Sequence, residues 1–463
     1  MNEVKNMNET NAARKSRQQL LTEGRPYRKI IGFTLPILIG SLFQQLYNMA
    51  DSLIVSRALG VQAFAGVSST GSITFLILGF AQGLTAGLAV QISQSVGAGD
   101  AQAVKRHYAH NLVISTAVTA LLTAFSLLGT DWLLNIMRTP ADILDYARSY
   151  IRIIFGGMTA SMFYNFFSNT LRALGDSKSP LYFLFAASGL NVVLDIVFIL
   201  FTPLGVAGAA WATVISQGVS AVLCLILILK KVEVLSLKGY REPLQLSVLL
   251  QNLRLGLPMA FQSSIIALGT IFMTYATNRM GSMAVAAYAA GNKIDGIAVE
   301  PLRSLGMTML TYTGQNYGAK KYGRILQGVR QSILIAAVLS LVLGLTMALG
   351  GRNLAYIFLG THDREVLGQT ALMLLVHGVC YMILGLLFLF RFTVQGLGQT
   401  LLPTLAGMME LVMRTIAAFF LVPKLEFLGA AVATPLSWLG ALIPVAAAYF
   451  LAAGKLRKET LEE

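Results

Sequence analysis

The sequence predicts an all-α polytopic membrane protein with twelve transmembrane helices, arranged as two parallel six-helix repeats around a central cavity. Three observations lead to this fold. First, the 463 residues are 55% hydrophobic and only 12% charged, about half the charged fraction of a soluble chain. Second, the apolar residues form continuous runs, which predicts helices rather than the alternating strands of a barrel. Third, several sequence blocks recur in both halves of the chain at a nearly constant offset.

The apolar runs define the expected transmembrane helices, each long enough or nearly long enough to cross a bilayer. They lie at about residues 30–55, 64–92, 108–128, 151–173, 181–202, 207–229, 253–277, 285–312, 331–349, 368–392, 402–422 and 429–453. An even number of crossings returns the chain to the side of the membrane on which it started.

The recurring blocks predict an internal duplication. They pair Pro36 with Pro258, Gln94 with Gln315, Arg172 with Gln395, and Gly208 with Gly429, at offsets of 221 to 223 residues. Each repeat therefore holds six helices, and the two repeats run in the same direction. The predicted organisation is a tail (1–28), an N-lobe (29–230), a linker (231–252), a C-lobe (253–453) and a second tail (454–463).

The net charge of +14 reports topology and does not predict nucleic-acid binding. With the N-terminus taken as cytoplasmic, 23 Lys and Arg residues fall on inner segments and 8 on outer connections. This asymmetry predicts that both termini are cytoplasmic. The polar first 29 residues contain no apolar core of a signal peptide and are expected to form a disordered tail. Cys224 and Cys380 lie in apolar segments and predict neither a disulfide framework nor a metal cluster.

The first apolar segment contains a carboxylate, and the rest of the functional interpretation is built around it. Gln44, Asn48 and Asp51 share one helical face. Pro36 lies fifteen residues before Asp51 and removes one backbone hydrogen bond, so we expect a hinge there. A charge within hydrocarbon is costly, which predicts that Asp51 faces a cavity and has a function.

Asp51 has possible partners in the fifth and sixth segments. Asn191 and Asp195 share a face, and Thr213 follows on the next segment. Two carboxylates, an amide oxygen and a hydroxyl suit a small hard cation such as Na⁺. The same two carboxylates cannot both stay charged in a medium of low dielectric, which equally suits H⁺. A structural alternative is that each acid is neutralised by its own buried partner.

The second repeat lacks this acidic pair. Met273 occupies the position that matches Asp51, and Ala418 occupies the position that matches Asp195. A carboxylate required only for the fold is expected twice, so the asymmetry favours a function for the pair.

Polar and aromatic residues near these positions are candidates for the lining of a substrate cavity, although a packing role is the alternative for each. The candidates are Gln44, Tyr47, Asn48, Tyr164, Gln217, Tyr275, Tyr288 and Asn292. The second half also carries charged residues within its helices, which predict either ion pairs that specify packing or a network with a coupling role. They are Lys293, Asp295, Glu300, Arg303, Arg391, Glu410 and Arg414.

The chain contains none of the motifs that would indicate an enzyme. There is no GxxxxGK[ST] for ATP, no HExxH and no GxSxG. The residues before Asp51 and Asp195 do not match the YD and GxGD motifs of intramembrane aspartyl proteases. We therefore expect no catalytic residues and no cofactor other than Na⁺ or H⁺ as a coupling ion.

At this point the chain resembles the multidrug and toxic compound extrusion (MATE) transporters, within the bacterial branch typified by DinF and MepA. The resemblance rests on the two six-helix repeats, on Pro36 with Gln44-x-x-Tyr47-Asn48-x-x-Asp51, on Asn191-x-x-x-Asp195 with Thr213, and on the Gly314–Ala319 turn. It implies a cation site at Asp51, Asn191, Asp195 and Thr213, and bending of the first helix at Pro36. The NorM branch uses acids in helices seven and ten, which this chain lacks.

The resemblance further implies secondary active efflux of cationic and amphipathic drugs by alternating access, coupled to entry of Na⁺ or H⁺. It implies a monomer in the bacterial inner membrane, with no nucleic-acid partner. The alternative within the same superfamily is a flippase for a lipid-linked envelope precursor, and a channel is a third reading.

Overall fold

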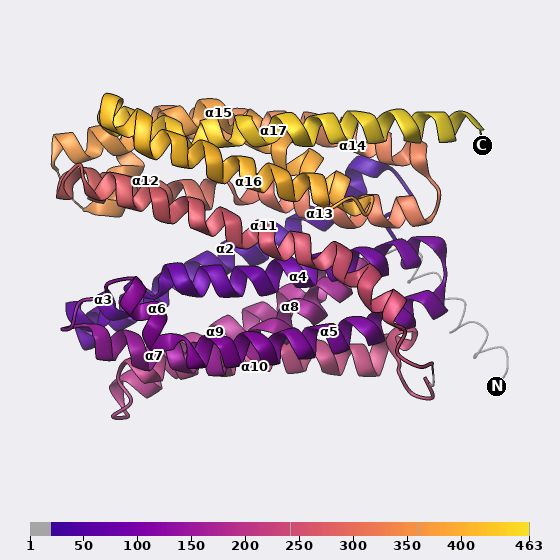
Figure 1. The fold of residues 1–463 in the computed structure, drawn as a ribbon, viewed down its shortest axis with the longest axis horizontal. Helices are drawn as coiled ribbons and strands as arrows, with labels where there is room; N and C mark the ends of the chain where they lie inside the picture. The colour runs from indigo at the N-terminus through magenta and orange to yellow at the C-terminus, as the bar shows by residue number, and fades with distance from the viewer. Residues whose placement is uncertain (1–19, 241, 361, 463) are drawn as a thin grey trace.

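A computed structural model describes residues 20–240, 242–360 and 362–462 (Figure 1). Within these residues the secondary structure is helical, with no β-strand. The first half contains α2 (Pro26–Leu59), α3 (Val61–Ser69), α4 (Gly71–Ala98), α5 (Ala101–Leu128), α6 (Thr130–Ile136), α7 (Leu144–Gly156), α8 (Met158–Ala173), α9 (Lys178–Leu200) and α10 (Val206–Lys231). The second half contains η1 (Glu233–Leu235), α11 (Leu246–Asn278), α12 (Ser282–Ala298), α13 (Glu300–Gly318), α14 (Tyr322–Leu359), α15 (Arg364–Gly396), α16 (Leu401–Ile416), η2 (Ala417–Leu421) and α17 (Val422–Glu462).

The helices account for the twelve predicted crossings. Nine helical stretches in the described residues are long and apolar enough to span a membrane. One of them, Leu401–Leu461, leaves helical geometry at Glu426 and turns back, so it crosses twice. The broken pairs α7–α8 and α12–α13 supply the remaining two crossings. Each expected segment therefore falls on one helix or one broken pair, and the predicted all-α fold is confirmed.

The two repeats meet through equivalent contacts, as two subunits do around a two-fold axis. A β-carbon built on Gly97 would lie 1.8 Å from the backbone oxygen of Gln315, and one built on Gly318 would lie 1.8 Å from that of Gln94. The side chain of Gln94 donates to the Gly396 carbonyl (3.0 Å), and that of Gln315 donates to the Ala173 carbonyl (2.8 Å). The predicted parallel duplication thus appears directly in the geometry.

These inter-lobe contacts lie near the end of the molecule where both chain ends emerge (Figure 1). Leu21 is buried there, its N–H donates to Gln315 (2.9 Å), and its carbonyl accepts from Arg324 (3.1 Å). The expectation of a disordered tail is therefore wrong for Leu21 to Gly24, which pack against α13 and α14. Residues 1–19 of the predicted tail lie outside the described residues. The lobes are closed at this end.

The connection between the lobes is shorter than the linker expected at 231–252. Helix α11 already begins at Leu246, because the polar stretch before residue 253 continues as helix.

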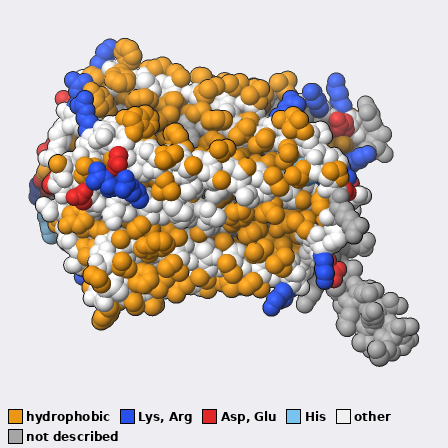
Figure 2. Space-filling view, turned by 60° about the horizontal axis from the view of Figure 1, so that its bottom comes forward, with side chains coloured by type: hydrophobic (Ala, Val, Ile, Leu, Met, Phe, Trp, Pro, Cys, Tyr) orange, Lys and Arg blue, Asp and Glu red, His pale blue; other side chains and the backbone are white. Residues whose placement is uncertain are grey.

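Pro36 lies within α2, which continues through it as one helix to Leu59. Figure 2 shows one face of the molecule, which is broadly apolar between its two ends and carries basic side chains toward those ends, as expected for a chain in a bilayer.

Candidate cation and substrate site

Two carboxyl groups meet inside the N-lobe, Asp51 from α2 and Asp195 from α9. They interact directly with each other, and Asp195 is fully buried whereas Asp51 is half-buried. Among the described residues neither carboxylate forms an ion pair, and Oδ1 of each has no hydrogen-bond partner. The acids therefore face each other in this structure instead of separate basic partners.

Asn191 and Thr213 complete the predicted group. Asn191 is 1% exposed and lies one helical turn before Asp195 on α9. With its amide oriented to satisfy its neighbours, the nitrogen donates to Asp195 Oδ2 (3.3 Å) and the oxygen accepts from the Thr213 backbone N–H (3.3 Å). The Thr213 hydroxyl instead interacts with Tyr150 of α7. The structure thus brings all four predicted residues together, with Thr213 contacting Asn191 through its backbone.

Tyr150 is the residue of this site that the sequence reasoning missed. Its hydroxyl lies beside Thr213 and near both Asp51 and Asp195. A tyrosine at the end of a membrane span is typical of the interfacial aromatic belt, so the sequence offers no signal that this one turns inward.

A polar cavity of about 410 Å³ adjoins the carboxylate pair. The predicted residues Gln44, Tyr47, Asn48, Tyr164 and Gln217 line it together with Asp51. The Tyr47 hydroxyl lies beside the side chains of Gln217 and Gln44. This volume lies within the range of about 300–1,000 Å³ that is usual for small-molecule sites.

The residues of this site suit a monovalent cation or a proton. The unpartnered oxygens of Asp51 and Asp195 are hard donors aimed into a buried, low-dielectric region. Burying two adjacent carboxylates without a counter-charge is costly, so the pair gains stability by taking up one positive charge. Na⁺ and H⁺ both meet this requirement.

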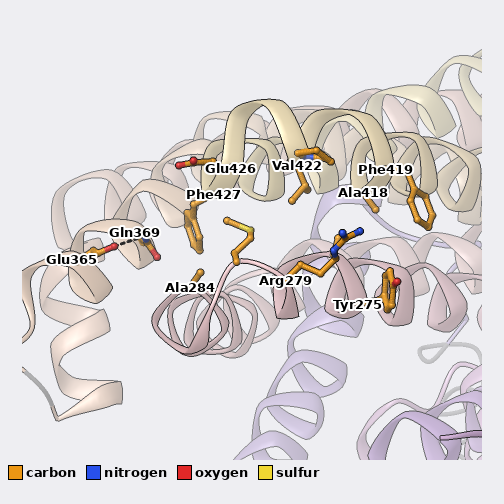
Figure 3. Close-up of a pocket in the computed structure, with 13 residues that line it drawn as sticks. Tyr275, Arg279, Ala284, Glu365, Gln369, Ala418, Phe419, Val422, Glu426 and Phe427 are labelled. Carbon is orange, nitrogen blue, oxygen red and sulfur yellow. Dashed lines mark hydrogen bonds between the residues drawn. The ribbon is translucent and has the colours of Figure 1, made fainter. Parts of the chain in front are cut away.

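The other predicted cavity residues lie in the C-lobe and not around this cavity. Tyr275 lines a second pocket of about 570 Å³, near the end opposite the termini. Figure 3 shows Tyr275 and Arg279 of α11 facing this pocket from one side, and Phe419 and Glu426 facing it from the other. In this structure Tyr275 therefore lies apart from the N-lobe cavity, and its role in binding substrate stays a prediction.

Tyr288 and Asn292 also lie apart from the N-lobe cavity. Tyr288 is buried within the C-lobe, where its hydroxyl interacts with Asn292 and Thr434. Asn292 is itself exposed. Which lobe an aromatic side chain faces depends on how its helix is rotated about its own axis. In a helix that is apolar on all sides, the spacing of apolar residues does not determine that rotation.

The charged residues of the C-lobe form separate local pairs rather than one network. Glu410 of α16 pairs with Arg391 of α15, and both side chains are buried. Arg414 lies four residues after Glu410 on the same helix but does not pair with it, and donates instead to Ser437 of α17 (3.2 Å).

A second buried group surrounds Asp295. Its Oδ1 accepts from the Tyr381 hydroxyl (2.8 Å) and lies 3.0 Å from Nδ1 of His377, which is fully buried. That imidazole contact lacks hydrogen-bond geometry. The sequence reasoning overlooked both α15 residues, although a histidine in the middle of an apolar segment is a signal in itself.

The remaining charges of this group follow from the break between α12 and α13 at Val299. Glu300 is buried and pairs with Arg303 (3.3 Å). Lys293 is exposed on α12. Lys293 and Glu300 belong to different helices, because the break at Val299 separates α12 from α13.

Comparison with known proteins agrees with the fold and the duplication. The MatE family model matches the chain twice, over residues 36–197 and 258–420. "Probable multidrug resistance protein YoeA" of Bacillus subtilis is 27% identical over 442 residues, covering 92% of this chain and 95% of the relative. "Probable multidrug resistance protein YpnP" of the same organism is 29% identical, covering 66% of this chain and 68% of the relative. The solved structure "Crystal structure of MATE in the bent conformation" superposes with a TM-score of 0.86 at 24% identity, covering 95% of this chain and 98% of that one.

Proposed function

The chain belongs to the MatE family of membrane transporters, and on this basis we propose that it exports cationic and amphipathic drugs by antiport with Na⁺ or H⁺. The relatives named as multidrug resistance proteins support drug efflux. We place the protein in the bacterial inner membrane as a monomer, with the end that carries both termini on the cytoplasmic side, as the distribution of basic residues favours.

The observation that carries this proposal is the unpaired Asp51–Asp195 couple beside the polar N-lobe cavity. Asp51 lines that cavity, so a cationic drug and a coupling ion would compete for the same negative charge. Such competition links the two fluxes, because each ligand then binds the two conformations of the carrier unequally.

In the proposed cycle the lobes close alternately at the two ends. The structure is closed at the end with the termini, so a coupling ion would enter from the opposite side and release the drug. Rotation of the lobes about the pseudo-two-fold contacts would then expose the site to the cytoplasm. The hinge role of Pro36 remains a prediction, since α2 is continuous in this state.

The proposal is tested with purified protein in liposomes, using a fluorescent cationic dye and either a Na⁺ gradient or a proton gradient alone. We expect one gradient to drive dye movement and Asp195→Asn to abolish it. Asp142→Asn is the matched control, because this carboxylate of the same lobe is exposed.

Normal counterflow by Asp195→Asn would contradict the assignment of the cation site. Folded wild-type protein that moves no dye under either gradient would contradict drug antiport and favour the flippase, to be tested with lipid-linked substrates. Dye flux that does not saturate would instead favour a channel.

A further inference from the structure

A groove on the outer surface of the N-lobe lies behind the polar cavity and has the opposite character. It measures about 560 Å³ and opens between α5, α8 and α10. Its walls include Leu112, Phe163, Phe167, Gly218 and Leu225. Among the described residues that line it, Thr159 and Tyr108 alone carry a polar group. It faces the bilayer, so its natural contents are hydrocarbon.

Small side chains create this groove. A β-carbon built on Gly218 would have only the Ala160 β-carbon near it, at 3.8 Å. Helices α8 and α10 therefore leave a furrow at this height, while the aromatic rings of Phe163 and Phe167 form its side. The adjacent residue Gln217 lines the inner cavity, so α10 separates the groove from the cavity.

The linker between the lobes closes the groove at the end with the termini. Leu235 of η1 is 1% exposed and packs into the N-lobe core, and both Leu235 and Leu237 line the groove. The next residue, Lys238, lines a neighbouring recess together with Lys105 of α5. The apolar groove thus leads directly to a basic surface at the membrane boundary.

Four lysines belong to these two features: Lys105 and Lys238 line the recess, and Lys230 and Lys231 directly follow a residue of the groove in the sequence. Lys230 and Lys231 follow Leu229, which itself lines the groove, and together with Lys238 they are exposed. None of the four forms an ion pair within the part of the chain that the structure describes.

The carboxylate in the recess is already neutralised. Glu242 pairs with Arg106 (3.0 Å) and accepts from Gln102 (2.6 Å). These hydrogen bonds lower the pKa of Glu242, with Gln102 the larger cause and Arg106 next. The negative charge of Glu242 is therefore balanced by Arg106. The charges of Lys105 and Lys238 are not balanced by it, so the recess is basic.

We propose that this groove and its lysines form a binding site for an anionic phospholipid, with one acyl chain between α5, α8 and α10 and the head group at Lys105, Lys230 and Lys238. Both halves of such a lipid find complementary surface: hydrocarbon in the furrow and negative charge beside basic side chains at the leaflet surface. The site is independent of the transported substrate and of the coupling ion.

The test uses the purified full-length protein and native mass spectrometry with phosphatidylglycerol or phosphatidylcholine of identical acyl chains. We expect wild-type protein to retain phosphatidylglycerol roughly tenfold more tightly. The triple variant Lys105→Gln/Lys230→Gln/Lys238→Gln should lose that preference and keep its affinity for phosphatidylcholine. Gly218→Leu fills the furrow and should weaken binding of both lipids.

The control is Lys455→Gln/Arg457→Gln/Lys458→Gln, which removes exposed basic residues from α17 on the other lobe. It should bind both lipids as wild-type protein does, and size-exclusion and melting profiles establish that every variant is folded. Equal retention of the two lipids by wild-type protein, or an unchanged preference in the triple variant, would overturn the head-group site. Wild-type binding by folded Gly218→Leu would overturn the acyl-chain site.

Discussion

Tyr150 positions the N-lobe site through a hydroxyl rather than a charge. That hydroxyl interacts with Thr213 and lies near the two carboxylates, so we expect it to constrain the group that we propose as the cation site. Tyr150→Phe keeps the ring and removes this polar contact, whose loss we expect to cost no more than a hydrogen bond, about 0.5–1.5 kcal/mol. We expect the concentration of coupling ion that half-saturates dye efflux to rise roughly two- to tenfold.

This change is measured in the same liposomes by varying the ion at constant dye. Tyr146→Phe is the control, because Tyr146 is exposed on the same helix. An unchanged ion dependence in Tyr150→Phe would remove Tyr150 from the site.

Removing only one residue of the buried Arg391–Glu410 pair should destabilise the folded protein. Both side chains are 5% exposed, so Glu410→Ala strands a guanidinium in the lobe interior. We expect this to lower the free energy of unfolding by about 3–5 kcal/mol, visible as a lower melting temperature.

Replacing both residues distinguishes the pair from simple packing. Arg391→Met/Glu410→Met should recover most of the lost stability, because no charge is then left unpaired. Asp131→Ala, which breaks an exposed pair with Arg148 and Arg152, should change the melting temperature little. If the double variant melts as low as Glu410→Ala, charge pairing is not the cause.

At the scale of the helix, the closed end depends on α4 meeting α13 backbone to backbone. Gly97→Ala would place a methyl group 1.8 Å from the Gln315 carbonyl oxygen, which has no rotamer to escape into. We expect this to disfavour the closed state by about 1–3 kcal/mol and to slow dye efflux.

Maleimide labelling of Ser95→Cys, a buried position beside this contact, reports the change. Labelling should be faster in the Gly97→Ala background. Gly189→Ala is the control, since a β-carbon there meets nothing within 4 Å. Equal labelling rates in the two backgrounds would show that closure tolerates the methyl group.

Helix breaks mark where sequence reasoning lost accuracy at this scale. The apolar runs predicted the spans, because hydrocarbon forces every backbone group into helical hydrogen bonds. The runs did not predict the break between α7 and α8, where Gly157 lies against Val214, nor the break at Val299. The break at Val299 comes two residues before Pro301, which is a local signal in the sequence itself. The break at Gly157 instead involves a close contact with Val214 of another helix, α10. Contact with another helix also decides the partner of Glu410. It pairs with Arg391 of α15 and not with Arg414, although Arg414 lies at the favourable i, i+4 spacing on its own helix.

Across the whole molecule, the sequence predicted the positions of the charged N-lobe residues better than those of the aromatic C-lobe residues. Asp51 and Asp195 stand out because a carboxylate in an apolar run needs a compensating environment. The pairing of Asp51 with Asp195 then follows from the absence of basic residues in the neighbouring spans. Tyr275 and Tyr288 are uncharged, so turning either side chain toward lipid or toward protein has no comparable energetic cost. The sequence therefore did not determine which way they point.

The reciprocal contacts of Gln94 and Gln315 have a consequence for ancestry. Each glutamine donates to a carbonyl at the equivalent position of the opposite repeat. Identical subunits make such paired contacts across a dimer axis. The interface therefore has the geometry of a homodimer of six-helix proteins whose two copies became one polypeptide through residues 232–245. Fusion of this kind allows the two copies to differ, as they do at Met273 and Ala418, while the joint surface keeps its symmetry.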